Sequence, residues 1–424
     1  MADPSGAGAV SPTLAINEEI ARRRAAGLET VALGFGEASV PVHPALAERL
    51  AAYADRGGYG PVAGIPELRE SAAGYWSRRG VATTPDQVVA GPGSKPLLYA
   101  LFQSLGGPVL LPRPSWVSYA AQNLLLRQQS PTVPTPSGQG GVPDPDLLAE
   151  AAGRLRDAGR PATAVLVTIP DNPTGTVASP DVVRRLCAVA EEHDLVIVSD
   201  EIYLDLVHEE ATVVVTPAEV CPERTITTTG LSKSLALGGW RLGVARFPDS
   251  ERHARTRQRV TVAASEIWSA PAHPVQLAAA WAFAEPDVLR ERILRSRALH
   301  GRVARAVAAV FRGAPAEVPP PTAGFYLYPD FSGSRGRLAA HGIETSADLA
   351  TSLLDRHGVA TLPGVAFGDD PDRLALRVAT PMLYGPDDEH RAQALASDDP
   401  ENLPWVRASL DTVEASLRDL LGGP

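Results

Sequence analysis

Residues 195–203 are Leu-Val-Ile-Val-Ser-Asp-Glu-Ile-Tyr, an apolar run that ends in two neighbouring carboxylates. Continuous apolar runs of this length are typical of strands that are buried on both faces of a parallel sheet. Further runs lie at 88–90, 109–111, 164–169 and 241–247, and helical patterns separate them. Strands that alternate with helices predict an α/β fold with a mostly parallel central sheet flanked by helices.

The pattern around the sheet predicts how the rest of the chain is organised. Ser179-Pro180 has the features of a helix start, and apolar residues at 406, 410, 413, 417 and 420 predict a closing amphipathic helix. The acidic stretch 384–403 lacks periodicity, so we expect a surface loop or insertion there. We expect a large domain at 46–300 and a smaller α+β domain assembled from 1–45 and 301–424.

Composition narrows the class of protein. The chain has 424 residues, a formal net charge of −10 and a pI of about 5.5, which argues against a nucleic-acid binder. Two cysteines are too few for a disulfide framework or a cysteine-based zinc site. Residues 1–10 contain no basic stretch followed by an apolar core, and no segment approaches the apolar length of a membrane span. We expect a cytoplasmic protein with no membrane or nucleic-acid partner and no metal.

The segment 230–243 carries the strongest chemical signal. Lys233 lies among small and apolar residues, where desolvation favours the neutral amine that a Schiff base requires. Arg241 follows eight residues later and could hold a phosphate, with Ser232 supplying a hydroxyl. The alternative is an ordinary surface lysine in a Ser/Gly loop.

Two further motifs end strands of the expected sheet. Asp200 would lie at the carboxyl edge of the sheet, where it could keep a heterocycle's ring nitrogen protonated, and Tyr203 could reach that ring's oxygen. The turn 170–175 presents Asn172, whose amide can donate to the same oxygen. The alternatives are an Asp that caps the following helix and a simple turn.

A fourth motif, at 91–95, ends one strand and opens a helix. Glycine makes the free amides of such a helix start approachable, so we assign a phosphate to the amides of Ser94 and Lys95. The segment matches neither a Walker A loop nor the dinucleotide fingerprint. Trp116 follows shortly after and could stack on a flat ring, although a tryptophan of the core is the alternative.

With these motifs in this order, the chain resembles the class I and II aminotransferases, which are fold type I enzymes that depend on pyridoxal 5'-phosphate (PLP). The resemblance is nearest to the aspartate and prephenate aminotransferase branch. It extends almost from end to end, through 11–17, 33–37, 59–69, 324–326, 363–368 and 376–378. A fold type I structure is therefore implied.

The resemblance implies a role for each matching residue. Lys233 would carry PLP as a Schiff base, Asp200 would pair with the pyridine nitrogen, and Tyr203 and Asn172 would meet the ring oxygen. The expected cofactor-binding residues are Tyr59, Ser94, Lys95, Trp116, Asn172, Asp200, Tyr203, Ser232, Lys233 and Arg241. Tyr59 would reach the site of the neighbouring subunit in a homodimer. Arg377 would bind the substrate α-carboxylate, and Gly36, Trp116 and Asn172 would help to bind the substrate.

The chain departs from the family pattern at two of these motifs. Gly230 stands where a serine is usual, and Gly36-Glu37-Ala38 stands where Gly-Glu-Pro is usual. The implied activity is transfer of an α-amino group between an L-amino acid and a 2-oxo acid. The alternative is a PLP-dependent lyase, a β- or γ-substitution enzyme, or a carbon–carbon bond-forming enzyme of biosynthesis. A non-catalytic relative would be expected to lack Lys233 or Asp200, and both are present.

Overall fold

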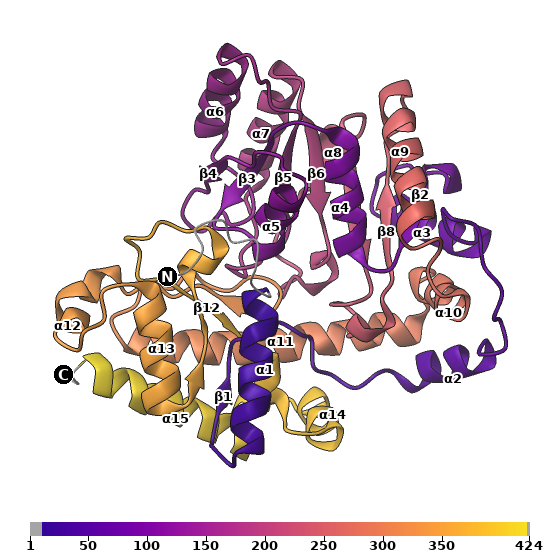
Figure 1. The fold of residues 1–424 in the computed structure, drawn as a ribbon. Coiled ribbons are helices and arrows are strands. Elements are labelled where there is room, and N and C mark those ends of the chain that lie inside the picture. Colours follow the sequence, from indigo (N-terminus) through magenta and orange to yellow (C-terminus); the bar gives the residue numbers. More distant parts are fainter. Residues whose placement is uncertain (1–10, 422–424) are drawn as a thin grey trace.

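The computed structural model describes residues 11–421, so the expectation about residues 1–10 lies outside it. Its main sheet has seven strands in the order β2-β8-β7-β6-β5-β3-β4 (Figure 1). Their bounds are β2 Val88–Gly91, β3 Val109–Arg113, β4 Thr132–Pro134, β5 Ala164–Thr168, β6 Val196–Asp200, β7 Thr225–Gly230 and β8 Gly243–Arg246. Only β8 runs antiparallel to its neighbours β2 and β7. The prediction of a mostly parallel α/β sheet is confirmed.

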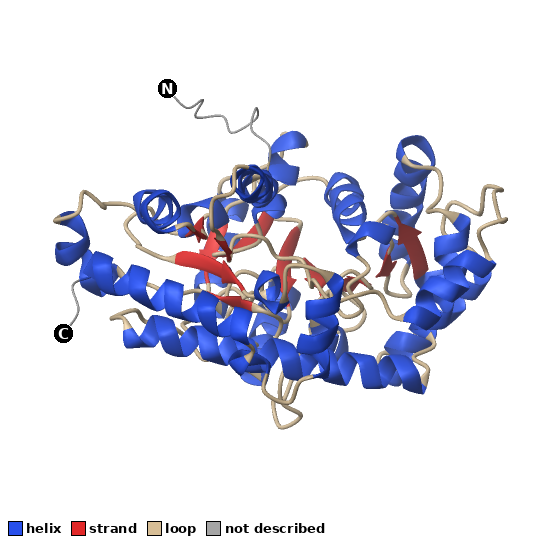
Figure 2. Cartoon of the chain, turned by 90° about the horizontal axis from the view of Figure 1, so that it is seen from below, coloured by secondary structure: helices blue, strands red, loops and turns tan. Residues whose placement is uncertain are grey.

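Helices cover both faces of this sheet because its strands are apolar on both sides. Leu166 and Val198 face a cluster that includes α4 (Ser94–Leu105), α5 (Val117–Leu125) and α9 (Glu251–Ile267). Their neighbours Val165 and Ile197 face the opposite cluster, with α6 (Pro145–Asp157) and α7 (Pro180–Glu192). The short helix α8 (Pro217–Val220) contacts α7 and β6. This alternation follows from the two-residue period of a strand. Figure 2 shows the strands in the middle of the molecule with helices around them.

A third apolar cluster lies beyond the β2 edge of the sheet. There α2 (Pro44–Ala52), α3 (Pro66–Arg78) and α10 (His273–Phe283) pack together around Trp76 and Phe283.

Both ends of the chain contribute to a separate core. β1 (Val31–Ala32) pairs with β10 (Val359–Ala360), and β11 (Leu362–Pro363), β12 (Leu376–Ala379) and β9 (Tyr326–Leu327) form a small antiparallel sheet. The surrounding helices are α1 (Pro12–Ala25), α11 (Asp287–Gly313), α12 (Arg335–Ala339), α13 (Ser346–His357) and α15 (Pro404–Leu421). α15 is the closing helix that the apolar spacing predicts, and its Val406, Leu410, Val413, Leu417 and Leu420 are buried.

Of the two expectations for 384–403, the surface loop is wrong, whereas the insertion stays a prediction. The segment contains α14 (Asp388–Ala396) and a short 3₁₀ turn at Pro400–Asn402, and α14 packs on α11. Asp387 caps α14 by accepting a hydrogen bond from the His390 amide. Only Ala394 of this helix is buried, so its sequence has no apolar period to reveal it.

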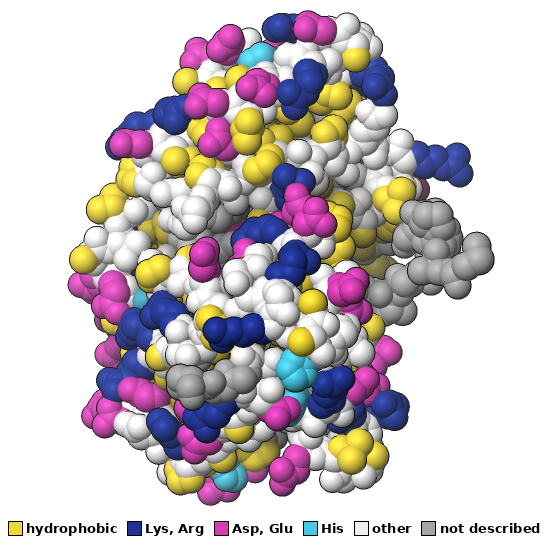
Figure 3. Space-filling view, turned by 90° about the vertical axis from the view of Figure 1, so that its left-hand side faces the viewer, with side chains coloured by type: hydrophobic (Ala, Val, Ile, Leu, Met, Phe, Trp, Pro, Cys, Tyr) yellow, Lys and Arg dark blue, Asp and Glu magenta, His cyan; other side chains and the backbone are white. Residues whose placement is uncertain are grey.

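The helices and the surface charge were compared with what a membrane span or a strongly charged face would require. No helix within residues 11–421 has the length and apolar character needed to cross a membrane. On the face drawn in Figure 3, acidic and basic side chains are interspersed.

Candidate active site

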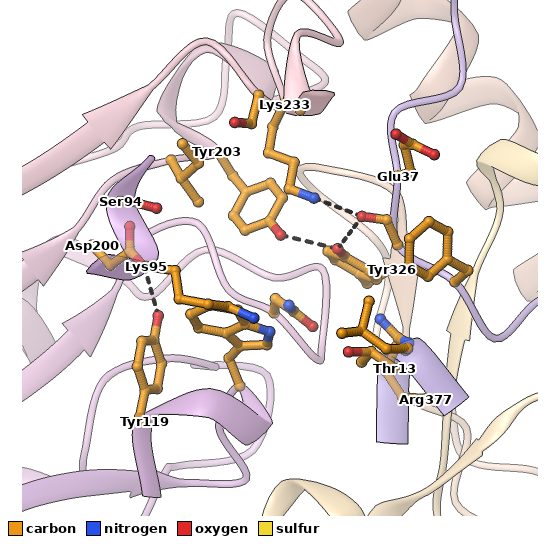
Figure 4. Close-up of a pocket in the computed structure, with 18 of the residues that line it drawn as sticks. Thr13, Glu37, Ser94, Lys95, Tyr119, Asp200, Tyr203, Lys233, Tyr326 and Arg377 are labelled. Carbon is orange, nitrogen blue, oxygen red and sulfur yellow. Dashed lines mark hydrogen bonds between the residues drawn. The ribbon is translucent and has the colours of Figure 1, made fainter. Parts of the chain in front are cut away.

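A cavity of about 440 Å³ lies at the carboxyl edge of the main sheet, the usual place for ligands in open α/β folds (Figure 4). The structure brings together there every site residue expected from the sequence except Tyr59. The lining residues are Thr13, Leu14, Phe35, Gly36, Glu37, Ser94, Lys95, Trp116, Tyr119, Asn172, Asp200, Ile202, Tyr203, Ser232, Lys233, Gly238, Arg241, Tyr326 and Arg377. Tyr59 lies elsewhere and is 95% exposed.

Lys233 follows the end of β7 and extends its amine into the cavity. Its Nζ donates a hydrogen bond of 2.6 Å to the carbonyl oxygen of Gly36. Burial lowers the pKa of Lys233 to about 8; the carboxylate of Glu37 opposes this shift, whereas the charge of Arg377 reinforces it. At pH 7 roughly a tenth of the Lys233 amine is therefore neutral, far more than for an ordinary lysine.

Asp200 ends β6 and is 2% exposed. Its carboxylate accepts hydrogen bonds from Tyr119 Oη at 2.8 Å and from Thr228 Oγ1 at 3.3 Å. Burial raises the pKa of Asp200 to about 6, and these two hydrogen bonds hold it below the value that burial alone would give. A buried carboxylate of this kind is well placed to pair with a cation inside the cavity.

One end of the cavity is built to receive an anion. α4 begins at Ser94, directly after Gly93, whose φ of 101° suits glycine. A Cβ on Gly93 would lie 2.4 Å from Arg241 Nη2, and one on Gly243 would lie 2.5 Å from the Ser94 amide nitrogen. The two glycines therefore let an arginine and a strand approach a helix N-terminus, where amide donors and the helix dipole favour negative charge.

An aromatic wall and two unpaired polar atoms complete the cavity. The Trp116 ring lies 5.0 Å from Lys95 Nζ and meets the Tyr119 ring edge to face. Within residues 11–421, Asn172 Oδ1 and Arg377 Nε are buried and lack a hydrogen-bond partner. Because unpaired buried polar atoms are costly, these two indicate that a ligand belongs in the cavity.

Arg377 comes from β12 of the small sheet and is 1% exposed. Its guanidinium donates to the carbonyl oxygen of Gly34 and lies with Cζ 5.2 Å from the centroid of the Tyr326 ring. A buried arginine that faces a cavity with an unpaired nitrogen can bind a carboxylate.

Three lining residues carry hydrogen bonds or charge that the sequence motifs did not assign. Tyr119, which holds Asp200, comes one helical turn after Trp116, and that spacing was a usable signal. Glu37 lies within the family-like segment 33–37, but nothing in the local sequence predicts its approach to Lys233. Tyr326 reaches the cavity from β9. Its paired residue, Ala379 of β12, is distant in sequence, so no local pattern indicates that Tyr326 lines the cavity.

The departure at Gly230 has a steric reason. A Cβ at this position would lie 2.9 Å from the carbonyl oxygen of Leu242 and 3.3 Å from the Cα of Gly243. The close pairing of β7 and β8 therefore leaves no room for the serine that the family usually has here.

The donor set fits PLP. One cavity holds four features that complement PLP, which is a flat phosphorylated pyridine with an aldehyde. The amine suits the aldehyde and the buried carboxylate suits the ring nitrogen, while the anion site suits the phosphate and the aromatic wall suits the ring face. Residues 11–421 contain no cluster of three or more His, Cys, Asp or Glu side chains that could hold a metal ion.

Comparison with known proteins agrees with this chemistry. Residues 30–383 match the family model "Aminotransferase class I and II". The "Aspartate/prephenate aminotransferase" of Thermus thermophilus is 33% identical over 368 residues, which are 84% of this chain and 89% of that protein. The probable aspartate/prephenate aminotransferase of Thermus aquaticus is 39% identical over 56% of this chain and 62% of its own length.

Solved structures show the same fold. The structure of Thermus thermophilus aspartate aminotransferase with maleate superposes with a TM-score of 0.81 at 27% identity, over 96% of this chain and 97% of that one. The expected fold type I architecture is therefore confirmed. The chain belongs to the class I and II aminotransferases, enzymes that transfer amino groups with the help of pyridoxal 5'-phosphate.

Proposed function

We propose that this aminotransferase moves the α-amino group between an L-amino acid and a 2-oxo acid, with Lys233 as the residue that carries PLP. The observation that supports this most directly is that an amine whose pKa is lowered to about 8 shares one cavity with a buried carboxylate, Asp200. The resemblance adds Ser94, Lys95, Ser232 and Arg241 as phosphate-binding residues. The position of Ser94, Lys95 and Arg241 at the start of α4, with Ser232 in the same cavity, supports that assignment.

The residues of the cavity divide the work of the reaction. Bound PLP supplies an electron-withdrawing ring that stabilises negative charge at the substrate Cα. Lys233 removes the proton from that carbon and returns one, because its amine is partly neutral near neutral pH. Asp200 holds a proton at the ring nitrogen, Arg377 binds the α-carboxylate, and Trp116 and Asn172 orient the ring and the substrate.

We further propose that the substrates are dicarboxylic, such as aspartate and 2-oxoglutarate. Two relatives that are 33% identical to this chain are aspartate/prephenate aminotransferases. The ammonium of Lys95 faces the same cavity as Arg377, so a second carboxylate has a second cation available.

A donor and acceptor screen tests both proposals. Aspartate, glutamate, alanine and phenylalanine are each paired with 2-oxoglutarate and with pyruvate, and formation of the 2-oxo acid is measured. The lyase, substitution and carbon–carbon bond-forming alternatives predict release of ammonia or of a leaving group, or a coupled product, with no conversion of the cofactor to its amine form. If that is the result with every donor, transamination is not the activity.

The assembly, the domain boundary and the location are also proposals. We propose a homodimer in which the exposed Tyr59 reaches the partner's site. Sedimentation would test the dimer against the monomer mass of 44.6 kDa.

We propose that the chain is divided into a large domain at 46–300 and a small domain made of 1–45 and 301–424. Helix α11 continues across the boundary between residues 300 and 301. A cytoplasmic location follows from the two unpaired cysteines as a proposal.

The lowered pKa of Lys233 predicts how PLP capture depends on pH. Only the neutral amine attacks an aldehyde, so the rate constant for Schiff-base formation should rise about tenfold per pH unit below pH 8 and level off above it. Stopped-flow absorbance of the apoenzyme mixed with PLP between pH 6 and pH 10 measures this. A midpoint above pH 10, the value of an ordinary lysine, would contradict the proposed environment.

Replacing Arg377 with leucine should lower kcat/KM by about 10²-fold, since hydrogen bonds to charged groups contribute roughly 1.5–3 kcal/mol each. The matched control is Arg373→Leu. Arg373 precedes β12 and pairs with Asp330 and Asp369, outside the cavity. Its loss should lower the thermal midpoint and leave kcat/KM within a fewfold of the wild type. Equal losses of kcat/KM in both variants would remove Arg377 from the substrate site.

A further inference from the structure

The lysine amines of this chain all lie in one place. Of the 39 lysines and arginines in the sequence, only Lys95 and Lys233 are lysines, and both line the cavity at the edge of the main sheet (Figure 4). The other members of that count are arginines, whose guanidinium groups stay protonated and have no lone pair to attack an electrophile. Chemistry that needs a lysine amine is therefore confined to this cavity.

The surroundings of Lys95 favour a reactive amine. Lys95 is the second residue of α4, and its Nζ lies 5.0 Å from the centroid of the Trp116 ring. Burial lowers the pKa of Lys95, and the like charge of Arg241 lowers it further. Within residues 11–421, no carboxylate pairs with this ammonium to oppose the two effects. More of the Lys95 amine is therefore neutral at a given pH than in an exposed lysine.

The two lysines differ in whether the amine stays available. Lys233 donates to Gly36 O at 2.6 Å, and it is the residue proposed to carry PLP. A nitrogen that is joined to the cofactor does not react with an acyl group. Lys95 is then the one lysine of the holoenzyme with a free amine, so the inference that follows rests on the proposed function.

The cations of the cavity indicate which kind of reagent reaches Lys95. Under the proposed assignment Arg241 binds the phosphate of PLP, which leaves Lys95 and Arg377 as cations for a second anion. An acyl phosphate is a small anion that also carries an electrophilic carbon, so it is attracted to the same place as a dicarboxylic substrate.

We propose that Lys95 is a modification site, at which an acyl phosphate transfers its acyl group to the amine. The neutral nitrogen attacks the acyl carbon and a C–N bond forms, while the bond from that carbon to the phosphate oxygen breaks. The proton that the nitrogen loses goes to the departing phosphate. The resulting amide has no charge, so the cavity loses the cation proposed to bind the second carboxylate of the substrate.

The first test locates the acyl group. The PLP-loaded enzyme is treated with acetyl phosphate, and mass mapping measures acetylation at each lysine. Lys95 should be acetylated and Lys233 should not, whereas both should react in the apoenzyme. A holoenzyme that gains no acetyl group on Lys95 overturns the inference. Acetylation of Lys233 at the same rate with and without PLP overturns the proposed function instead.

The matched control is Arg160→Lys, which places an ordinary amine at an exposed position outside the cavity. Because burial lowers the pKa of Lys95, its acetylation rate should level off at lower pH than the rate at position 160. Succinate, an unreactive dicarboxylate, should slow acetylation of Lys95 about tenfold at about ten times its dissociation constant, and should not affect position 160. If the two positions have the same pH profile, or if succinate protects neither, the inference is wrong.

The second test measures the consequence for the reaction. Acetylation should raise the KM for aspartate about tenfold or more, because a charge-assisted hydrogen bond is lost, and should change the KM for alanine less than about twofold. Lys95→Arg keeps a cation but has no lysine amine, so its KM for aspartate should not respond to acetyl phosphate. Equal rises for aspartate and alanine, or a response of Lys95→Arg equal to that of the wild type, would contradict the proposed site.

Discussion

Lys233→Ala is expected to lower the rate of amino-group transfer by at least about 10⁴-fold. The substitution removes the amine that attaches PLP and the base that moves the α proton, and proton transfer by a positioned side chain alone contributes about 10²–10⁴-fold. The cavity around position 233 is lined by many other side chains, so the variant should still fold and bind PLP without a covalent bond. The measurement is the half-reaction with aspartate, followed by the absorbance change of the bound cofactor.

Borohydride reduction identifies the attachment site directly. Reduction of the wild-type holoenzyme should fix the cofactor to the peptide that contains Lys233, which mass mapping detects, and the Lys233→Ala protein should carry none. The matched control is Lys95→Ala, which removes another amine from the same cavity. Lys95→Ala should keep the covalent cofactor and change mainly the KM for a dicarboxylic donor. If the reduced cofactor is found on Lys95, or if the Lys233→Ala protein still carries it covalently, Lys233 is not the attachment site.

The main sheet could be predicted from sequence because most of its strands are apolar on both faces. The five apolar runs correspond to β2, β3, β5, β6 and β8. β7 was not predicted, since its sequence Thr-Ile-Thr-Thr-Thr-Gly is polar in composition although every residue is buried. Three of its four threonines form side-chain hydrogen bonds, as Thr228 does with Asp200 and Thr225 with the carbonyl oxygen of Cys221. Burial of polar residues depends on such partners, which a local pattern does not reveal.

The same distinction holds for the cavity. Asp200 is the last residue of β6, and Asn172 and Lys233 follow β5 and β7 of the same sheet. Their meeting at its carboxyl edge therefore follows from the order of strands and helices. Tyr326 and Glu37 come from segments that lie far apart in the sequence. Their approach depends on the pairing of β9 with β12 and on the course of the chain after β1, and both are contacts between residues distant in sequence. Sequence motifs could indicate the chemistry of this cavity but not the hydrogen bonds around Gly36.

Asp200→Asn is expected to lower kcat by about 10²–10⁴-fold while leaving the fold intact. The amide has nearly the same shape as the carboxylate, but its single oxygen can replace only one of the two that accept from Tyr119 and Thr228, and it has no negative charge to hold a proton at the ring nitrogen. Breaking a buried charge pair costs roughly 3–5 kcal/mol, and each 1.4 kcal/mol is a factor of ten in rate. Single-turnover kinetics with aspartate separate this loss from any change in PLP affinity.

The chain offers a matched control in Asp171, which is also 2% exposed but lies outside the lining of the cavity and bonds to Thr174. Asp171→Asn should lower stability and change kcat by less than about tenfold. A second variant tests the mechanism by pH. The Tyr119 hydrogen bond lowers the pKa of Asp200, so Tyr119→Phe should raise that pKa and move the acid limb of the activity profile to higher pH. If Asp200→Asn retains more than a tenth of the wild-type kcat, the carboxylate does not hold the ring proton, and the role of this strand end in catalysis has to be assigned differently.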